Sequence, residues 1–304
     1  MNLRLRLLNW VLHTFEKPRL AYTTDPLLAR KYFHYQRFLF YDPPYATYLP
    51  DQLGSVPAIW VARRARRRGL LLYFHGGAYV MGSPATHRGM VARLASLIGV
   101  PALLPDYRKA PEHPFPAAFE DAWTAWQAVL DRGYPPESII LGGDSADGGL
   151  ALALLSRICT SDGPRPAAVF ACSPWTDLTL SGASLVENAG TDHLLPAHRT
   201  VEARDSYLAG ADPVDPRASP LFAKFPNCPP VLLQAANTEI LRDDTKRMAE
   251  ALRSQGADVT LDLLGDLPHV WTIFQGWLPE ADEALTRIAD FTTARLRARP
   301  PACS

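Results

Sequence analysis

Short runs of apolar residues alternate along most of the chain with longer segments that have a helical apolar period. From about residue 57 the short runs are bounded by glycine, proline and polar turn residues, and this pattern predicts strands. The predicted strands are Ala58–Val61, Leu70–Phe74, Ala102–Pro105, Ser138–Leu141, Ala168–Cys172, Val231–Ala235 and Val259–Leu264. The predicted helices lie near residues 85–98, 116–132, 146–158, 242–255 and 279–297.

The order of these elements indicates the fold class. The first strands follow one another without a helix, which favours antiparallel or mixed pairing. The later strands alternate with helices, and this alternation predicts a mostly parallel sheet with helices on both faces. Such sheets bind ligands beyond the carboxyl ends of their strands. We therefore expect one α/β domain over residues 1–304, with its functional residues at strand ends.

Two segments do not fit the sheet pattern. Residues 1–50 begin with helical spacing, because Leu8, Val11, Leu12 and Phe15 would share one helix face, and then become loop-rich. Residues 180–220 are much longer than a simple connection between two strands requires. We expect both segments to form a helical cap over the strand ends.

Composition narrows the class of protein. The 304 residues are 47% hydrophobic, which fits a folded globular chain, and 31 basic residues balance 31 acidic ones. No net charge therefore attracts nucleic acid, and the basic run Arg63–Arg68 is interpreted as the tip of a surface loop. Four cysteines, at positions 159, 172, 228 and 303, lack metal-ligand spacing and are expected to be reduced.

The amino-terminal residues loosely resemble a signal peptide, because Arg4 and Arg6 precede an apolar run. Asn9 and His13 interrupt that run, and no small-residue cleavage site follows, so an amphipathic helix is favoured. No later segment approaches the roughly 20 apolar residues of a membrane span. These features predict a cytoplasmic protein without stable membrane insertion.

A strand followed at once by a serine and a helix is the strongest chemical signal. Gly142-Gly143-Asp144-Ser145-Ala146 has this arrangement, in which a sharp turn presents a serine hydroxyl to a base. The same turn directs the amide of Ala146, at a helix N-terminus, toward a developing oxyanion. Ser145 is therefore the candidate nucleophile.

Two further motifs fit the same chemistry. The predicted strand Leu70–Phe74 runs into His75-Gly76-Gly77, whose glycine amides can approach an oxyanion because no Cβ intervenes. We interpret His75 as an architectural residue. His269 follows the last predicted strand, where the general base of a serine hydrolase is expected. The other histidines lack this position.

The acid that would orient His269 is less sharply defined. The loop after Val231–Ala235 contains Glu239, whereas Asp243 and Asp244 open the next predicted helix, where acidic residues also favour the helix dipole. A carboxylate on this loop would hold the imidazole tautomer and stabilise the imidazolium. Glu239 is the favoured candidate, with Asp243 or Asp244 as the alternative.

Taken together, these motifs resemble the hormone-sensitive lipase family of bacterial carboxylesterases, over about residues 55–295. The resemblance rests on His75-Gly76-Gly77, on the segment from Asp106-Tyr107-Arg108 to Ala110-Pro111-Glu112, on Gly143–Ala146 and on Pro268-His269-Val270. It implies an α/β-hydrolase fold with a mostly parallel central sheet and a helical cap.

The resemblance also implies functional residues. It assigns the nucleophile to Ser145, the base to His269, the acid to Glu239 and the oxyanion donors to the amides of Gly76, Gly77 and Ala146. Residues beside these motifs are candidates for the substrate pocket, namely Tyr79, Asp144 and Val270. The segment from Asp106 to Glu112 would buttress the site.

The expected activity is hydrolysis of short-to-medium acyl esters through an acyl-enzyme, on a small-molecule substrate. No metal or organic cofactor is expected, and a homodimer is possible. Short acyl chains are favoured because a cap encloses a finite pocket, whereas a large lipid interface would need an exposed apolar lid. An amidase, a lactonase or a peptidase could use the same residues.

Two positions depart from the family pattern. Ala78 replaces a glycine of the His-Gly-Gly run, a mild change. Asp147 stands where the G-x-S-x-G pattern has its last glycine. A side chain there should strain the turn, and a carboxylate should oppose the oxyanion. Asp147 therefore keeps open an alternative reading, a non-catalytic small-molecule binder or an impaired pseudoenzyme.

Overall fold

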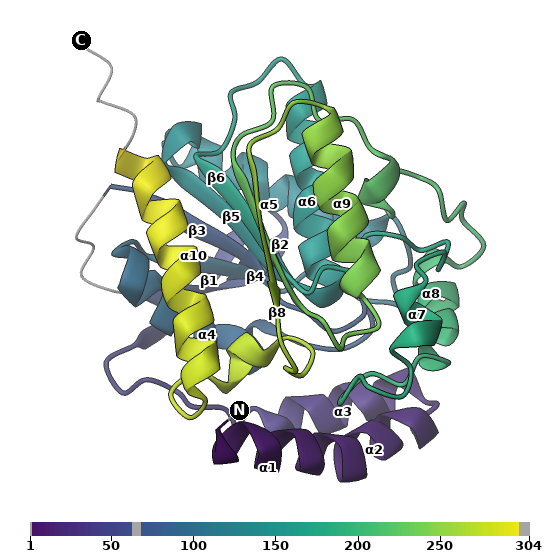
Figure 1. The fold of residues 1–304 in the computed structure, drawn as a ribbon. Coiled ribbons are helices and arrows are strands. Elements are labelled where there is room, and N and C mark those ends of the chain that lie inside the picture. Colours follow the sequence, from purple (N-terminus) through teal and green to yellow (C-terminus); the bar gives the residue numbers. More distant parts are fainter. Residues whose placement is uncertain (1, 63–67, 298–304) are drawn as a thin grey trace.

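A mixed eight-stranded sheet forms the centre of the molecule in the computed structural model, which describes residues 2–62 and 68–297 (Figure 1). The basic residues 63–67 and Cys303 lie outside the described residues. The strand order is β1-β2-β4-β3-β5-β6-β7-β8, and only β1 and β2 pair antiparallel with their neighbours. The strands are β1 (Thr47–Leu53), β2 (Val56–Ala62), β3 (Leu70–Phe74), β4 (Ala102–Pro105), β5 (Ile139–Asp144), β6 (Ala168–Cys172), β7 (Val231–Ala236) and β8 (Val259–Leu264).

Helices cover both faces of this sheet, as the alternation of elements predicted. One face packs against α4 (Pro84–Ile98) and α10 (Pro279–Arg297), and the other packs against α5 (Ala117–Asp131), α6 (Ser145–Thr160) and α9 (Arg242–Ser254). Successive residues of β3 point to opposite faces and are buried on both. The α/β-hydrolase fold is confirmed.

Strand β1 was not predicted from the sequence, and it begins inside residues 1–50, which were assigned to the cap. Only Leu53 of this strand is buried, because β1 is the edge strand and pairs on one side with β2. Pro50 is compatible with an edge position, where the missing N–H breaks no ladder hydrogen bond. A strand with so little burial has no apolar alternation for a sequence pattern to detect.

Two groups of helices lie at the end of the sheet that carries Ser145. The first consists of α1 (Leu3–Val11), the π-helical turn η1 (Leu12–Glu16), α2 (Lys17–Tyr22) and α3 (Pro26–Gln36). The second consists of α7 (Ser184–Glu187) and α8 (Arg199–Leu208). Figure 1 shows α1 and α2 end to end beneath the sheet, with α3 alongside them and α7 and α8 nearby. Short 3-10 turns complete the fold, namely η2 (Pro136–Ser138), η3 (Pro220–Phe222) and η4 (Trp271–Phe274).

The amino-terminal helix exists as predicted, but its buried face was predicted only in part. Leu8 and Leu12 are buried together with Leu5, and they pack on residues near α10. Val11 and Phe15 are instead 38% and 60% exposed. The π-helical turn changes the rotation per residue at Leu12, so the 3.6-residue period does not extend to Phe15. In the described residues, no helix is both long and apolar enough to cross a membrane.

Candidate active site

Ser145 lies at the turn between β5 and α6. Its φ of +55° places a non-glycine residue in the left-handed region, which costs roughly 1–3 kcal/mol and persists only where surrounding structure enforces it. Gly143 makes this turn possible, because a Cβ there would lie 2.3 Å from the Asp147 carbonyl oxygen. The Trp175 amide donates to the Ser145 carbonyl at 2.8 Å and holds the turn from outside. The sharp turn predicted from the sequence is present.

The structure brings Ser145, His269 and Glu239 into one hydrogen-bonded chain. His269 Nε2 lies 2.8 Å from Ser145 Oγ, and His269 Nδ1 lies 2.6 Å from Glu239 Oε2. Glu239 is fully buried and His269 is 4% exposed, whereas Ser145 is half-buried. Residues from β5, from the turn after β7 and from the loop after β8 therefore meet as a nucleophile, a base and an acid would.

The electrostatics of this chain favour proton acceptance by His269. Burial opposes the charged imidazole, but the hydrogen bond and the charge of Glu239 outweigh burial and raise the pKa of His269 above its ordinary value. Asp192 and Asp144 act in the same direction from further away. The site therefore stabilises an imidazolium at the moment a proton leaves Ser145.

Residues that the sequence analysis did not single out fix the acid. Glu239 Oε1 accepts hydrogen bonds from the Ser173 hydroxyl at 2.8 Å and from the Ala236 amide at 2.6 Å. Asp192, which is 1% exposed, accepts from the Ile240 amide at 2.9 Å and so anchors the turn after Glu239. These short polar side chains lie in loops, where no periodic pattern or motif distinguishes them.

The alternative acids have other partners. Asp244 Oδ2 accepts from the amides of Thr176 and Asp177, at 2.8 and 2.9 Å, and burial raises the pKa of Asp244 to about 7. Asp243 accepts from the Ser184 amide at 3.0 Å and pairs with Arg242. Both carboxyls thus tie α9 to neighbouring segments, and the geometry favours Glu239 as the partner of His269.

The loop after β3 has a different arrangement from the one the motif implied. The Gly76 amide donates to Asp144 Oδ1 at 3.0 Å, so this N–H is already engaged. A Cβ on Gly77 would lie 2.2 Å from the Met81 carbonyl oxygen, which explains why glycine is required there. Ala78 has a φ of +55° and lines the cavity beside Ser145. Available donors therefore lie at Gly77 and Ala78 rather than at Gly76.

Asp144 and His75 brace this loop. Asp144 also accepts from the Tyr73 hydroxyl at 2.7 Å and lies 3.3 Å from His87 Nε2. Although burial opposes its charge, His87, Tyr73 and the Gly76 amide lower the pKa of Asp144. His75 is fully buried and stacks on Tyr107 with 4.7 Å between ring centroids. Burial lowers the pKa of His75 well below its ordinary value, in agreement with an architectural role.

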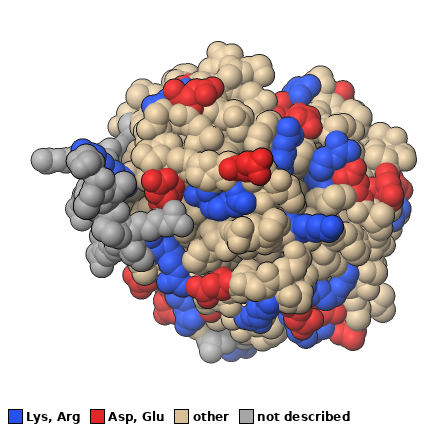
Figure 2. Space-filling model, turned by 90° about the horizontal axis from the view of Figure 1, so that it is seen from above, with Lys and Arg blue, Asp and Glu red and all other residues tan. Residues whose placement is uncertain are grey.

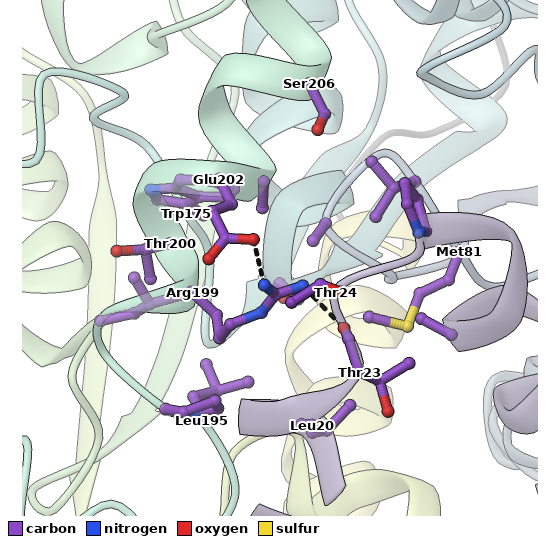
Figure 3. Close-up of a pocket in the computed structure, with 18 residues that line it drawn as sticks. Leu20, Thr23, Thr24, Met81, Trp175, Leu195, Arg199, Thr200, Glu202 and Ser206 are labelled. Atoms are coloured by element: carbon purple, nitrogen blue, oxygen red, sulfur yellow. Dashed lines mark hydrogen bonds and ion pairs between the residues drawn. The ribbon is translucent and has the colours of Figure 1, made fainter.

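A cavity with about 850 Å³ of empty space, partly open to solvent, reaches Ser145. Its lining comes from both predicted cap segments, from the loop after β3 and from Trp175. In Figure 3, Arg199 lies between Glu202 and Thr23. Arg199 pairs with Glu202 and donates to the Thr23 carbonyl at 2.7 Å, so it joins α8 to the connection between α2 and α3. The remaining lining is mainly apolar.

None of the three residues expected in the substrate pocket is among those that line this cavity. Tyr79 is 1% exposed and stacks on Tyr207 of α8 with 3.7 Å between ring centroids. Asp144 lies beneath the loop after β3, as described above. Val270 is buried, and its amide points to the Ser173 hydroxyl at 3.4 Å. All three are therefore buried structural residues around the site rather than parts of the cavity wall.

Comparison with known proteins matches residues 71–273 to a family described as having an alpha/beta hydrolase fold. An acetyl-hydrolase of Streptomyces hygroscopicus is 40% identical over 77% of this chain and 78% of its own length. An esterase of Acinetobacter venetianus is 36% identical over 84% and 85%. The crystal structure of an esterase from the bacterial hormone-sensitive lipase family matches 97% of this chain and 99% of its own, with 35% identity and a TM-score of 0.92.

This chain belongs to the bacterial hormone-sensitive lipase family. It is a carboxylic-ester hydrolase. The esterase EstE5, soaked with ethyl alcohol, has a similar structure, with 34% identity, a TM-score of 0.93 and matched shares of 98% of this chain and 100% of its own.

Asp147 remains unusual for this hormone-sensitive lipase family member. Its side chain is fully buried, and neither carboxyl oxygen has a hydrogen bond of ordinary geometry in the described part of the chain, although the Tyr107 hydroxyl interacts with the carboxyl closely enough to oppose the rise of its pKa. Burial raises the pKa of Asp147 well above its ordinary value, and Asp144 adds to the rise, while Tyr107 and Lys109 partly offset it. Burial therefore favours the neutral carboxyl over the charged one, and this acts against the charge repulsion of the oxyanion expected from the sequence.

This burial leads to a prediction about pH and stability. If folding raises the pKa of a carboxyl, the group leaves the free energy of unfolding unchanged below its unfolded pKa, near 4. Above that pH, the group lowers the free energy of unfolding by up to about 1.4 kcal/mol per pH unit. We expect the melting temperature of Asp147→Asn to exceed that of the wild type by an amount that grows from about pH 5 to about pH 8. Asp131→Asn, at an exposed position, serves as the control and should show a constant difference. A constant difference for Asp147→Asn as well would mean that Asp147 is ionised in the folded protein.

Proposed function

We propose that this protein is a serine carboxylesterase that hydrolyses short-to-medium acyl esters through an acyl-enzyme intermediate. The observation that carries the proposal is the hydrogen-bonded chain from Ser145 Oγ through His269 to the buried Glu239 carboxylate. In this arrangement the Ser145 hydroxyl can transfer its proton directly to His269. The hydroxyl is half-buried and borders the cavity.

In the first step, Ser145 Oγ attacks the ester carbonyl carbon while His269 Nε2 accepts the hydroxyl proton. Collapse of the tetrahedral intermediate breaks the bond to the alkoxy oxygen, and the imidazolium returns the proton so that the alcohol leaves. Water then attacks the acyl-enzyme with His269 again as base, and the carboxylic acid is released. Glu239 orients the imidazole throughout.

The oxyanion is held by backbone amides in this proposal. Ala146 lies at the N-terminus of α6, where the first amides have no partner within the helix. Gly77 supplies a second amide, and Ala78 replaces Gly76 as the third, because the Gly76 amide already donates to Asp144. Each such donor contributes roughly 100- to 1000-fold in turnover.

The cavity supports a limited substrate size. Its apolar walls suit an acyl chain, while Arg199 and Thr23 place polar groups at the side formed by the two cap segments. A pocket enclosed between helices holds short chains more completely than long ones.

One test of the proposed mechanism concerns the nucleophile. Ser145→Ala removes only the hydroxyl, so hydrolysis of p-nitrophenyl butyrate should fall by several orders of magnitude while the melting temperature is preserved or rises as the turn relaxes. Labelling by a fluorophosphonate probe should be lost in parallel. If the wild type itself neither hydrolyses the ester nor reacts with the probe, the reading as a binding protein on the same fold is correct.

Another test of the proposed mechanism concerns the acid. Glu239→Gln should lower turnover by a factor approaching about 10⁴, because the amide stabilises the wrong tautomer and cannot stabilise the imidazolium. Since Glu239 raises the pKa of His269, the acidic limb of the remaining activity should move to lower pH. Asp243→Asn is the matched control, with activity close to the wild type and a modest loss of stability. The reverse ranking of the two variants would assign the acid to α9.

A further inference from the structure

The first helices carry apolar side chains on two faces. One face of α1 is buried against the body of the protein through Leu5, Leu8 and Leu12. A second stripe is exposed and consists of Leu3, Leu7, Trp10, Val11 and Phe15, with exposed fractions from 38% to 80%. Trp10 and Phe15 contact each other edge to face at 5.5 Å. A helix of a monomeric soluble domain normally has a polar outer face, so this stripe requires an explanation.

The exposed apolar surface continues beyond α1. In the described residues, fourteen of the twenty exposed large hydrophobic side chains lie between Leu3 and Tyr45, including Tyr22, Phe38 and Leu39. We call α1, η1, α2, α3 and the following turn to residue 45 the N-terminal layer. Figure 1 shows the helices of this layer packed side by side along one end of the molecule. The concentration on one end indicates an interaction surface rather than scattered exposure.

The N-terminal layer is also strongly basic. Residues 3–45 contain seven lysines and arginines but three acidic residues, whereas the whole chain is balanced at 31 of each. Arg4, Arg6 and Lys31 are exposed, and Arg37 lies over the Phe38 ring at 4.6 Å. The face opposite this layer, seen in Figure 2, carries basic and acidic side chains interspersed. In the N-terminal layer, exposed apolar side chains and exposed basic side chains therefore occur together.

We propose that the N-terminal layer docks on an anionic lipid surface. Exposed Trp, Phe and Leu side chains beside Lys and Arg are the composition of helices that lie in a membrane interface, with the apolar face in the acyl boundary and the cations near anionic headgroups. A second copy of the chain fits less well, because a two-fold interface would bring the same positive surface against itself. This docking requires no membrane-spanning helix.

Docking would place the cavity beside the lipid. Leu20, Thr23, Pro26 and Ala29 of the same layer line the cavity that reaches Ser145. An ester that partitions into the interface would thus be presented next to the cavity wall. A large lipid interface was expected to need an exposed apolar surface over the cap, and the outer side of the cap carries such side chains. The inference concerns binding and holds whether or not the proposed esterase mechanism is correct.

The test compares binding to vesicles of phosphatidylcholine with binding to vesicles rich in phosphatidylglycerol, measured by flotation. We expect binding at least tenfold tighter to the anionic vesicles, and weaker binding as salt is raised. Trp10→Gln combined with Phe15→Ser should weaken binding at least tenfold. Arg6→Glu combined with Lys31→Glu should do the same, because each basic side chain near the surface contributes about fivefold.

The control is Phe222→Ser, at a 45% exposed aromatic residue of η3 outside the layer, which should bind like the wild type. Hydrolysis of water-soluble p-nitrophenyl butyrate and the melting temperature report that the variants are folded. Equal binding to both vesicle types, or absence of binding, would overturn the proposal. Light scattering would also overturn the proposal if the wild type were a dimer and the Trp10 and Phe15 substitutions made it a monomer. The N-terminal layer would then be the interface with a second copy of the chain.

Discussion

The buried Glu239 carboxylate is the interaction on which the site depends. A charge with no exposure to water is stable only where hydrogen bonds and an opposite charge replace its hydration. Here the Ser173 hydroxyl, the Ala236 amide and His269 supply those contacts from three separate segments. Ser173 follows β6, Ala236 ends β7 and His269 lies in the loop after β8, so the order of these neighbouring strands brings the partners of Glu239 to one place.

The serine turn depends on a second buried carboxylate. Asp144 accepts from Tyr73 and from the Gly76 amide, and it lies against His87. It thereby connects the residue before the nucleophile to the loop that carries Gly77 and Ala78. The same contacts explain why one glycine of that loop braces the site instead of contacting the substrate. Positive φ values at Ala78 and Ser145 are maintained because this network leaves the backbone little freedom to relax.

Burial in the folded protein changes the electrostatic effect expected of Asp147. In the sequence it is a carboxylate beside the nucleophile and would oppose an oxyanion. In the folded protein it is surrounded by Tyr79, Tyr107 and Tyr207, which respond electrostatically to it, and burial raises its pKa so that the neutral acid is favoured. The shift toward the neutral acid lowers the free energy of unfolding at pH values above the unfolded pKa of the carboxyl.

Local patterns of the sequence predicted the mostly parallel sheet, its five flanking helices and a candidate serine, acid and histidine in that order, because buried strands and strand-to-helix turns leave strong local patterns. They could not detect β1, whose side chains are mostly exposed, nor the π-helical turn Leu12–Glu16 in which Phe15 is exposed. Three features depended on the tertiary structure. They are the geometry that favours Glu239 over Asp243 and Asp244, the contacts of Ser173 and Asp192 around the acid, and the hydrogen bond of the Gly76 amide. These features arise from contacts between residues far apart in the chain, and such contacts have no periodicity along it.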